Sequence, residues 1–252
     1  MTGVNAPRRE VLVTGGGRGI GRAIVLRFAE AGARVFVNFF VNRDAAEKTA
    51  RDVELAGGAA HLVQADVKEP AEIRRMFSEI ARVTPRLDVL VSNAASGVLK
   101  DATALTAKHW DWVLATNARP LLLCAQEAAK RMSAGGRIIS LSSLGSERVI
   151  PGYAAVGVSK AAAEALTRYL AVELAPRGIT VNTVCAGAVD TDIWRAIPGG
   201  DGLLESVRSR TPSGGLVTAE AVAEIVFFLA SPAAQPIQGQ IIVADGGYSL
   251  LA

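Results

Sequence analysis

Short apolar runs alternate along the chain with longer segments that have a helical pattern of apolar and polar positions. The short runs, rich in Val, Ile and Leu, predict strands at 10–14, 34–38, 60–65, 89–92, 137–142, 180–184 and 240–243. The longer segments predict helices at 20–31, 45–56, 70–83, 106–132, 157–174 and 219–230. Pro70 suits a first helical position, Thr106 and Thr218 suit helix caps, and Pro120 predicts a bend in the fourth helix.

The predicted strands are apolar throughout rather than alternating, which is typical of parallel strands buried on both faces. Strands that alternate with helices of this length indicate βαβ units. We therefore predict an α/β fold, a single-domain Rossmann-type doubly wound parallel sheet of about seven strands flanked by helices. No linker rich in Pro, Gly or Ser and no internal repeat divides residues 1–252 into two domains.

The segment 193–217 departs from this pattern. It is rich in Gly, Pro, Ser and Arg, and it is long for a connection between two elements. Long connections of this composition are usually functional loops or disordered segments. We predict that this segment is a lid over a substrate site.

Composition and charge exclude several classes of function. Apolar residues make up 50% of the 252 residues, so the chain is not globally disordered. The 27 Lys and Arg against 24 Asp and Glu leave a formal charge of +3 without a long basic run, so nucleic acid and anionic membranes are not expected partners. The cysteines Cys124 and Cys185 form no CxxC motif, and with two histidines the chain offers no expected metal site. No apolar N-terminal segment and no run of about 18 apolar residues occurs, which predicts a cytoplasmic protein.

A glycine-rich turn, Thr14-Gly-Gly-Gly-Arg-Gly-Ile-Gly21, separates the first predicted strand from the first helix. Glycines let a backbone turn tightly and approach a pyrophosphate, and the helix N-terminus supplies free N–H groups and a positive dipole end. Glycines also occur in ordinary tight turns, but the order of strand, turn and helix predicts a dinucleotide-binding site. The residues expected to contact the cofactor here are Gly15, Arg18, Gly19, Ile20 and Gly21.

The end of the second predicted strand distinguishes NAD from NADP. A carboxylate there would bind a ribose 2′-hydroxyl and repel a 2′-phosphate. This chain has Asn38 at that point and no acidic residue until Asp44, whereas Arg18 and Arg43 are near enough in sequence to meet a 2′-phosphate. We predict NADPH as the cofactor, with NADH less favoured; the alternative is that both arginines are solvated surface residues.

Further segments resemble the short-chain dehydrogenase/reductase family over nearly the whole chain. Besides the glycine turn, they are Asp66-Val67, Asn93-Ala94-Ala95, Asn117, Ser142-Ser143, Lys160, Ala186-Gly187 through Thr191, and Asp245-Gly246-Gly247. The resemblance implies that Asp66 and Val67 contact the adenine, Asn93 and Ala94 line the adenosine side, Lys160 holds the nicotinamide ribose, Asn117 kinks its helix near the lysine, and Gly187, Val189 and Thr191 belong to the segment around the carboxamide. It also implies a homotetramer or homodimer.

One departure from the family pattern concerns the catalytic tyrosine. The family places it four residues before the lysine, where this chain has Val156; Tyr153 stands seven residues before Lys160 instead. Both spacings put a residue on nearly the same helix face as the lysine, about 40° and 20° from alignment, but Tyr153 lies one turn further along the axis, about 4.5 Å. Hydride transfer to the β-carbon of an enoyl thioester needs a hydroxyl further from the nicotinamide than carbonyl reduction does.

The spacing of Tyr153 and Lys160 is similar to that of NADPH-dependent enoyl-acyl-carrier-protein reductases, the type III branch of this family. We therefore predict reduction of an acyl thioester carried by acyl carrier protein or coenzyme A, with Tyr153, Lys160, Ser143 and Asn117 as catalytic residues. One alternative is a carbonyl reductase that uses the same site. A second is an NADP-binding protein without turnover.

Overall fold

The computed structural model describes residues 8–190 and 200–251. Seven parallel strands form one sheet in the order β3-β2-β1-β4-β5-β6-β7. Their bounds are β1 Glu10–Val13, β2 Arg34–Phe39, β3 Ala59–Gln64, β4 Val89–Ser92, β5 Arg137–Ser143, β6 Thr180–Ala186 and β7 Ile241–Ala244. The strand order reverses between β1 and β4, and ligands of doubly wound sheets bind beyond the carboxyl ends of the strands at such a point. The predicted fold is confirmed.

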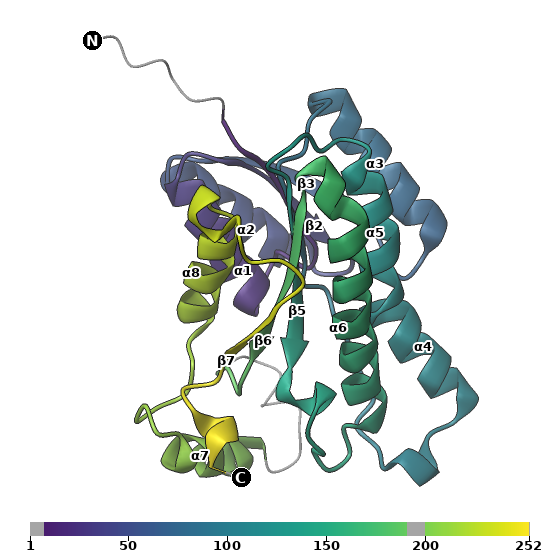
Figure 1. Ribbon diagram of the computed structural model, residues 1–252, viewed down its shortest axis with the longest axis vertical. Coiled ribbons are helices and arrows are strands. Elements are labelled where there is room, and N and C mark those ends of the chain that lie inside the picture. The colour runs from purple at the N-terminus through teal and green to yellow at the C-terminus, as the bar shows by residue number, and fades with distance from the viewer. Residues whose placement is uncertain (1–7, 191–199, 252) are drawn as a thin grey trace.

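Helices cover both faces of the sheet (Figure 1). One face is covered by α1 Gly19–Glu30, α2 Arg43–Leu55 and α8 Ala219–Leu229, and the other by α3 Pro70–Val83, α4 Ala107–Asn117, α5 Arg119–Ala129 and α6 Ala154–Leu174. Two apolar cores form as a result, because side chains of each strand alternate between the faces: Leu12 and Leu90 pack toward α3 and α5, whereas Val11 and Val13 pack toward α1. The remaining helix, α7 Gly200–Arg210, lies beyond the carboxyl ends of the strands, beside the C-terminus (Figure 1).

The structure corrects one predicted helix and adds another. The segment 106–132 forms α4 and α5, separated at Ala118, rather than one bent helix ending at Met132. Pro120 lacks the N–H that a continuous helix would need at this point, so the chain restarts with the proline in the first turn of α5. Helix α7 was not predicted, because two glycines open it and Leu204 is its buried apolar residue among the described positions.

Two smaller differences bear on the functional site. Helix α6 begins three residues before the predicted start at position 157, so Tyr153 becomes its N-cap. Strand β6 continues two residues beyond position 184, which places Cys185 within the sheet, opposite Ser142 of β5. Within the described part of the chain, no helix is long and apolar enough to cross a membrane.

Candidate active site

The glycine turn joins β1 to α1 at the point where the strand order reverses. Gly15 has a φ of 64°, which favours glycine, and a Cβ at this position would lie 3.0 Å from the Ala94 Cα. A Cβ at Gly21 would overlap the carbonyl oxygen of Gly15. Among the described residues, no side chain caps the first N–H groups of α1, and its first turn has no acidic residue. The turn therefore fits an anionic pyrophosphate, with free N–H groups and an open backbone.

Hydrogen bonds from neutral side chains fix the position of this turn. The Asn93 amide Nδ2 donates hydrogen bonds to the carbonyl oxygens of Thr14 and Gly15, at 2.9 and 3.2 Å. The Thr14 hydroxyl in turn accepts from the backbone N–H groups of Asn93 and Ala94, at 2.9 and 3.0 Å. Asn93 and Ala94 thus lie beside the turn, where the sequence predicted the adenosine side of a cofactor.

Asn38 lies near the end of β2, as predicted, and its side chain points into the protein. Its side chain is 2% exposed, accepts a hydrogen bond from the Gly15 N–H at 3.2 Å, and donates to the carbonyl oxygens of Val63 and Ala65. The amide is therefore used to join the glycine turn to β2 and β3. A contact between Asn38 and the cofactor stays a prediction.

The two predicted phosphate-binding arginines lie at the N-termini of two helices. Arg18 is the exposed N-cap of α1. Arg43 opens α2, where its guanidinium donates to the Gln64 side chain at 3.1 Å and lies 3.6 Å from the Glu47 carboxylate. The partners of Arg43 offset part of its charge, so Arg18 is the stronger candidate for an unshared contact with a phosphate.

Asp66 and Val67 follow β3 in a tight turn. The Asp66 carboxylate accepts from the Lys68 N–H at 2.9 Å and lies 3.4 Å from the Lys68 ammonium. This ion pair raises the pKa of Lys68. Val67 is buried in the core between the sheet and α3. The turn therefore presents its backbone and the Asp66 side chain in a fixed position, as adenine recognition requires.

The second cluster of candidate residues lies where β5 ends and α6 begins; we call it the catalytic corner, defined by Ser143, Tyr153 and Lys160. Ser143 is the last residue of β5, and Tyr153 caps α6. The Ser143 side chain lies close enough to the Tyr153 hydroxyl to act on its pKa. Burial raises the pKa of Tyr153, and Ser143 opposes that effect. The phenol is therefore a protonated hydrogen-bond donor over the neutral pH range.

Glycines leave the space that the Tyr153 ring occupies. A Cβ at Gly145 would lie 2.6 Å from Cδ1 and 2.7 Å from Cε1 of that ring. Val156, at the family's usual tyrosine position, is 6% exposed and packs with Val113 and Ala155 between α4 and α6. A Cβ at Gly97 would overlap its Cγ2. The usual tyrosine position is thus part of an apolar cluster, and the hydroxyl of the corner comes from Tyr153.

Lys160 is buried one turn and a half into α6. Its ammonium donates a hydrogen bond to the Leu141 carbonyl at 2.9 Å. Burial lowers the pKa of Lys160 to about 8, and the negative charge of Glu164 acts in the opposite direction. The group is therefore mostly protonated at neutral pH and loses its charge above about pH 8.

Asn117 ends α4 beside the catalytic corner. Its Oδ1 accepts from the Ser96 N–H at 2.9 Å, and its Nδ2 donates to the Ser96 carbonyl and the Ser159 hydroxyl, at 2.9 and 3.0 Å. Ser159 adjoins Lys160 in α6. Asn117 therefore joins the loop after β4 to the helix that holds the lysine, at the break between α4 and α5.

The remaining predicted cofactor residues follow β6. The Gly187 N–H donates to the Ala244 carbonyl at 2.9 Å, and a Cβ at Gly187 would lie 2.8 Å from the Asp245 Cβ. Val189 is buried and pairs with Val217 through an isolated bridge, so the two ends of the intervening segment meet. Thr191 and positions 193–199 of the predicted lid lie outside the described residues.

Sequence reasoning missed a buried carboxylate beside the corner. Glu164 is 5% exposed, and its carboxylate accepts a hydrogen bond from the Ser142 hydroxyl. The signal was present in the sequence, because Glu164 follows Lys160 by four residues and thus shares its helix face. Only the structure supplies the partner on β5.

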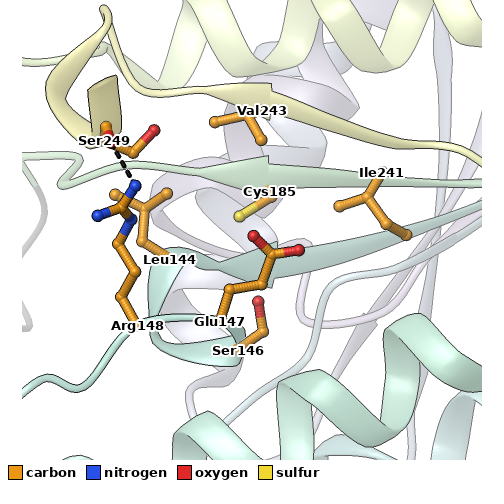
Figure 2. Close-up of a pocket in the computed structure, with 8 residues that line it drawn as sticks. All are labelled: Leu144, Ser146, Glu147, Arg148, Cys185, Ile241, Val243 and Ser249. Atoms are coloured by element: carbon orange, nitrogen blue, oxygen red, sulfur yellow. Dashed lines mark hydrogen bonds between the residues drawn. The ribbon is translucent and has the colours of Figure 1, made fainter.

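A pocket opens next to the corner, between the loop after β5, strands β6 and β7, and the C-terminal turn (Figure 2). Cys185 and Glu147 line it, and Arg148 donates to the Ser249 carbonyl at its edge. Burial raises the pKa of Cys185 to about 12, so its thiol is neutral and a poor nucleophile. No cluster of His, Cys, Asp or Glu with the makings of a metal site occurs in residues 8–190 and 200–251.

Comparison with known proteins gives a consistent family. The family model described as enoyl-(acyl carrier protein) reductase matches residues 15–249. The 1-cyclohexenylcarbonyl-CoA reductase of Streptomyces collinus is 44% identical over 250 residues, which cover 98% of this chain and 89% of that protein. The NADPH-dependent aldehyde reductase 2, chloroplastic, of Arabidopsis thaliana is 37% identical, with 95% and 93% covered.

A solved structure of a relative carries a cofactor. The short-chain dehydrogenase from Burkholderia cenocepacia J2315, in complex with NADP, is 35% identical and superposes with a TM-score of 0.90 over 96% of this chain and 98% of that one. The predicted preference for NADPH agrees with this relative.

Proposed function

The chain belongs to the short-chain dehydrogenase/reductase family and is an oxidoreductase of that family, and we propose that it reduces the carbon–carbon double bond of an enoyl thioester with NADPH. The observation that carries this proposal is the position of the tyrosine. Tyr153 stands at the N-cap of α6 with Ser143 close by, while an apolar side chain, Val156, fills the nearer position. A hydroxyl one turn further from Lys160 suits a carbonyl oxygen that lies three bonds from the carbon that accepts hydride, rather than one bond as in a ketone.

NADPH fits the residues around the glycine turn and the catalytic corner. The glycine turn receives the pyrophosphate, Arg18 with Arg43 meets the 2′-phosphate, and Lys160 donates to the ribose hydroxyls. The supporting set for the adenine and nicotinamide ends is Asp66, Val67, Asn93, Ala94, Gly187, Val189 and Thr191. When bound, NADPH supplies the hydride.

Tyr153 and Ser143 act on the thioester oxygen. As hydride adds to the β-carbon, the electron pair of the double bond moves toward the carbonyl, and negative charge builds on that oxygen. The Tyr153 hydroxyl donates a hydrogen bond to it, and Ser143 supplies a second hydroxyl close by. The α-carbon then takes a proton from water, and the saturated thioester leaves. The buried Lys160 ammonium adds positive potential to the same site.

Coenzyme A is the carrier that the relatives favour. The name of the Streptomyces protein gives a CoA thioester whose carbonyl adjoins a ring double bond, and this relative shares 44% of the compared residues. We therefore propose an α,β-unsaturated acyl-CoA as substrate ahead of an acyl-carrier-protein thioester, which the description of the matching family model keeps as the second choice.

The segment 193–217 is proposed as the lid over the acyl group. The bridge between Val189 and Val217 brings the last residue of this segment next to the chain that leaves β6. The Ser213 N–H donates to the Gly246 carbonyl at 3.1 Å, which ties the end of the segment to the C-terminal turn. Helix α7 belongs to this segment and lies beyond the carboxyl ends of the strands (Figure 1).

A homotetramer or homodimer is part of the same proposal. Tyr169 and Val172 are 70% and 76% exposed on α6, and Phe228 and Leu250 are exposed on α8 and the C-terminal turn. Large apolar side chains of this kind suit contacts between copies of the chain.

A carbonyl reductase is the second candidate, and the Arabidopsis aldehyde reductase favours it. The same pair of hydroxyls, Tyr153 and Ser143, would then bind the oxygen of a ketone or aldehyde. Retention of this pair together with Lys160 and Asn117 disfavours the third candidate, a cofactor-binding protein without turnover.

One panel of assays separates the three. Oxidation of NADPH and of NADH is followed with crotonyl-CoA, acetoacetyl-CoA and a simple ketone, using the purified wild-type protein. Turnover with crotonyl-CoA and NADPH is the expected result. Turnover with acetoacetyl-CoA or the ketone alone would establish the carbonyl reductase, and cofactor binding without any turnover would favour the third candidate.

A further inference from the structure

A row of polar side chains runs along the buried face of α6. Lys160, Glu164 and Thr167 are 7%, 5% and 0% exposed, and spacings of four and three residues put them on one face. The face packs on β5 and β6, in a part of the molecule where apolar side chains otherwise fill the core. The row starts at the catalytic corner and leads away from it.

Each member of the row has a partner on the sheet. Lys160 donates to the Leu141 carbonyl, Glu164 accepts from the Ser142 hydroxyl, and the hydroxyls of Thr167 and Thr183 are hydrogen-bonded at 2.8 Å. A buried carboxylate is costly unless hydrogen bonds and opposite charge compensate it. Ser142 gives Glu164 one hydrogen bond, and the opposite charge nearest along the row is Lys160, one helical turn away.

The surroundings of Lys160 carry few other charges. Within the described residues, the groups that act on it electrostatically are Glu164 from its own helix and Cys185 from β6, whose thiol is neutral. Tyr153, Glu147 and Asp245 face Cys185 from the neighbouring loops and turn, and Asn117 approaches from α4 without a charge. Glu164 is thus the partner that compensates the buried ammonium.

We propose that Glu164 is a positioning residue for the reduction: anchored by Ser142, its carboxylate holds Lys160 in the charged form that grips the ribose of the cofactor. Burial alone would drive the lysine toward its neutral form, and a neutral amine makes weaker hydrogen bonds to hydroxyl groups than an ammonium does. The inference rests on the proposed function in one respect, namely that Lys160 holds the ribose.

The test measures the dissociation constant of NADPH between pH 6 and pH 10 for the wild type and Glu164→Gln. Glutamine keeps the volume and still accepts from Ser142, but it removes the charge. We expect affinity to fall as Lys160 deprotonates, with a midpoint near pH 8 in the wild type. In the variant the midpoint should lie about one pH unit lower, while affinity at pH 6 stays unchanged. Titration of the 2′-phosphate affects both proteins alike and cancels in their ratio.

Thr167→Val is the matched control, because it removes a buried hydrogen bond from the same helix face without removing a charge. It should lower the melting temperature and leave the midpoint in place. Should Glu164→Gln fail to fold, Ser142→Ala takes its place; the Glu164 carboxylate then loses its anchor beside Lys160, so the midpoint should move in the same direction by a smaller amount.

An unchanged midpoint in Glu164→Gln, or an equal shift in Thr167→Val, would overturn the inference. The readout is separate from the reaction. A shifted midpoint together with no turnover of crotonyl-CoA would support the role of Glu164 and refute enoyl reduction. Turnover of crotonyl-CoA with an unmoved midpoint would support enoyl reduction and refute the role of Glu164.

Discussion

The glycine turn and the catalytic corner differ in the kind of side chain that supports them: neutral amides at the turn and titratable groups at the corner. At the turn, neutral amides hold the backbone from behind: Asn38 and Asn93 are hydrogen-bonded to Thr14, Gly15 and the neighbouring strands. At the corner, the titratable groups are themselves shielded from solvent: Lys160 is buried and Tyr153 is partly buried. Tyr153 has a raised pKa and Lys160 a lowered one, and burial is the main cause of both.

The difference separates what each region contributes. We propose that the turn binds an anion through its N–H groups while its arginines lie in solvent, so changes there should alter cofactor affinity with little dependence on pH between 7 and 10. The corner uses burial to set protonation states, so changes there should alter turnover or shift a pH profile. The predictions below test this separation, from the largest expected effect to the smallest.

The largest effect is expected for Tyr153→Phe. The variant removes one oriented donor to the developing oxyanion and should lower turnover by about 10²–10³-fold. The affinity for NADPH should stay nearly unchanged, because the ribose is held by Lys160. Steady-state turnover and equilibrium NADPH binding measure the two quantities separately.

Two controls accompany this variant. Tyr169→Phe makes the same change at a 70% exposed position of α6 and should leave turnover as in the wild type. Lys160→Ala should lower both binding and turnover. Nearly full enoyl turnover in Tyr153→Phe would contradict the role assigned to the displaced tyrosine.

The next effect is expected at the glycine turn, for Gly21→Ala. The new Cβ would overlap the Gly15 carbonyl oxygen, so the turn must shift. Displacement of packed atoms costs about 1–3 kcal/mol, which is about five- to 150-fold in NADPH affinity if the turn takes all of it. Isothermal titration with NADPH provides the measurement.

Gly17→Ala is the matched control for this prediction. Its Cβ would lie 3.4 Å from the Ala46 backbone, an ordinary contact, and its φ is not positive. Equal losses of NADPH affinity in the two alanine variants would contradict the explanation from close backbone approach at Gly21.

A third effect concerns the choice between cofactors. Arg18→Ala should reduce the preference for NADPH over NADH by about ten- to a hundredfold, the worth of a charge-assisted contact with phosphate. Arg43→Ala should reduce it less, because Glu47 and Gln64 share that guanidinium. The dissociation constants of both cofactors are compared for each variant, with Arg82→Ala on the exposed side of α3 as control. Equal affinities of the wild type for NADPH and NADH would refute the assignment of both arginines.

The two regions also differ in how much of them the sequence predicts. The turn is local: its glycines, the strand before it and the helix after it all lie within residues 10–30, and the βαβ pattern predicts the doubly wound sheet. The local pattern does not predict where the Asn38 side chain points. Only the pairing of β2 with β3 shows that its amide forms hydrogen bonds inside the sheet.

The corner depends on contacts between distant segments. Helical spacing predicts that Tyr153 and Lys160 share a face, and α6 does reach back to Tyr153. It does not predict that Ser142 meets Glu164 or that Gly145 makes room for the ring, since those partners belong to another element and its loop. Helix α7 escaped prediction for a related reason: it has too few apolar positions for a clear period.

The smallest effect is expected in helix α7, which belongs to the proposed lid. Amide hydrogen exchange in α7 should slow a few-fold when NADPH and a saturated acyl-CoA are both bound, and less with NADPH alone. The bridge between Val189 and Val217 fixes the base of the segment, so ligands that fill the space beneath it should stabilise α7 against local opening. Linkage limits the gain to about 100-fold for a ligand at one hundred times its dissociation constant.

Helix α8, which is packed into the core against α1, serves as the internal control and should exchange at the same rate with and without ligands. Full protection of α7 in the free protein, equal to that of α8, would mean that the segment is a rigid part of the fold and that the acyl group is enclosed without its movement.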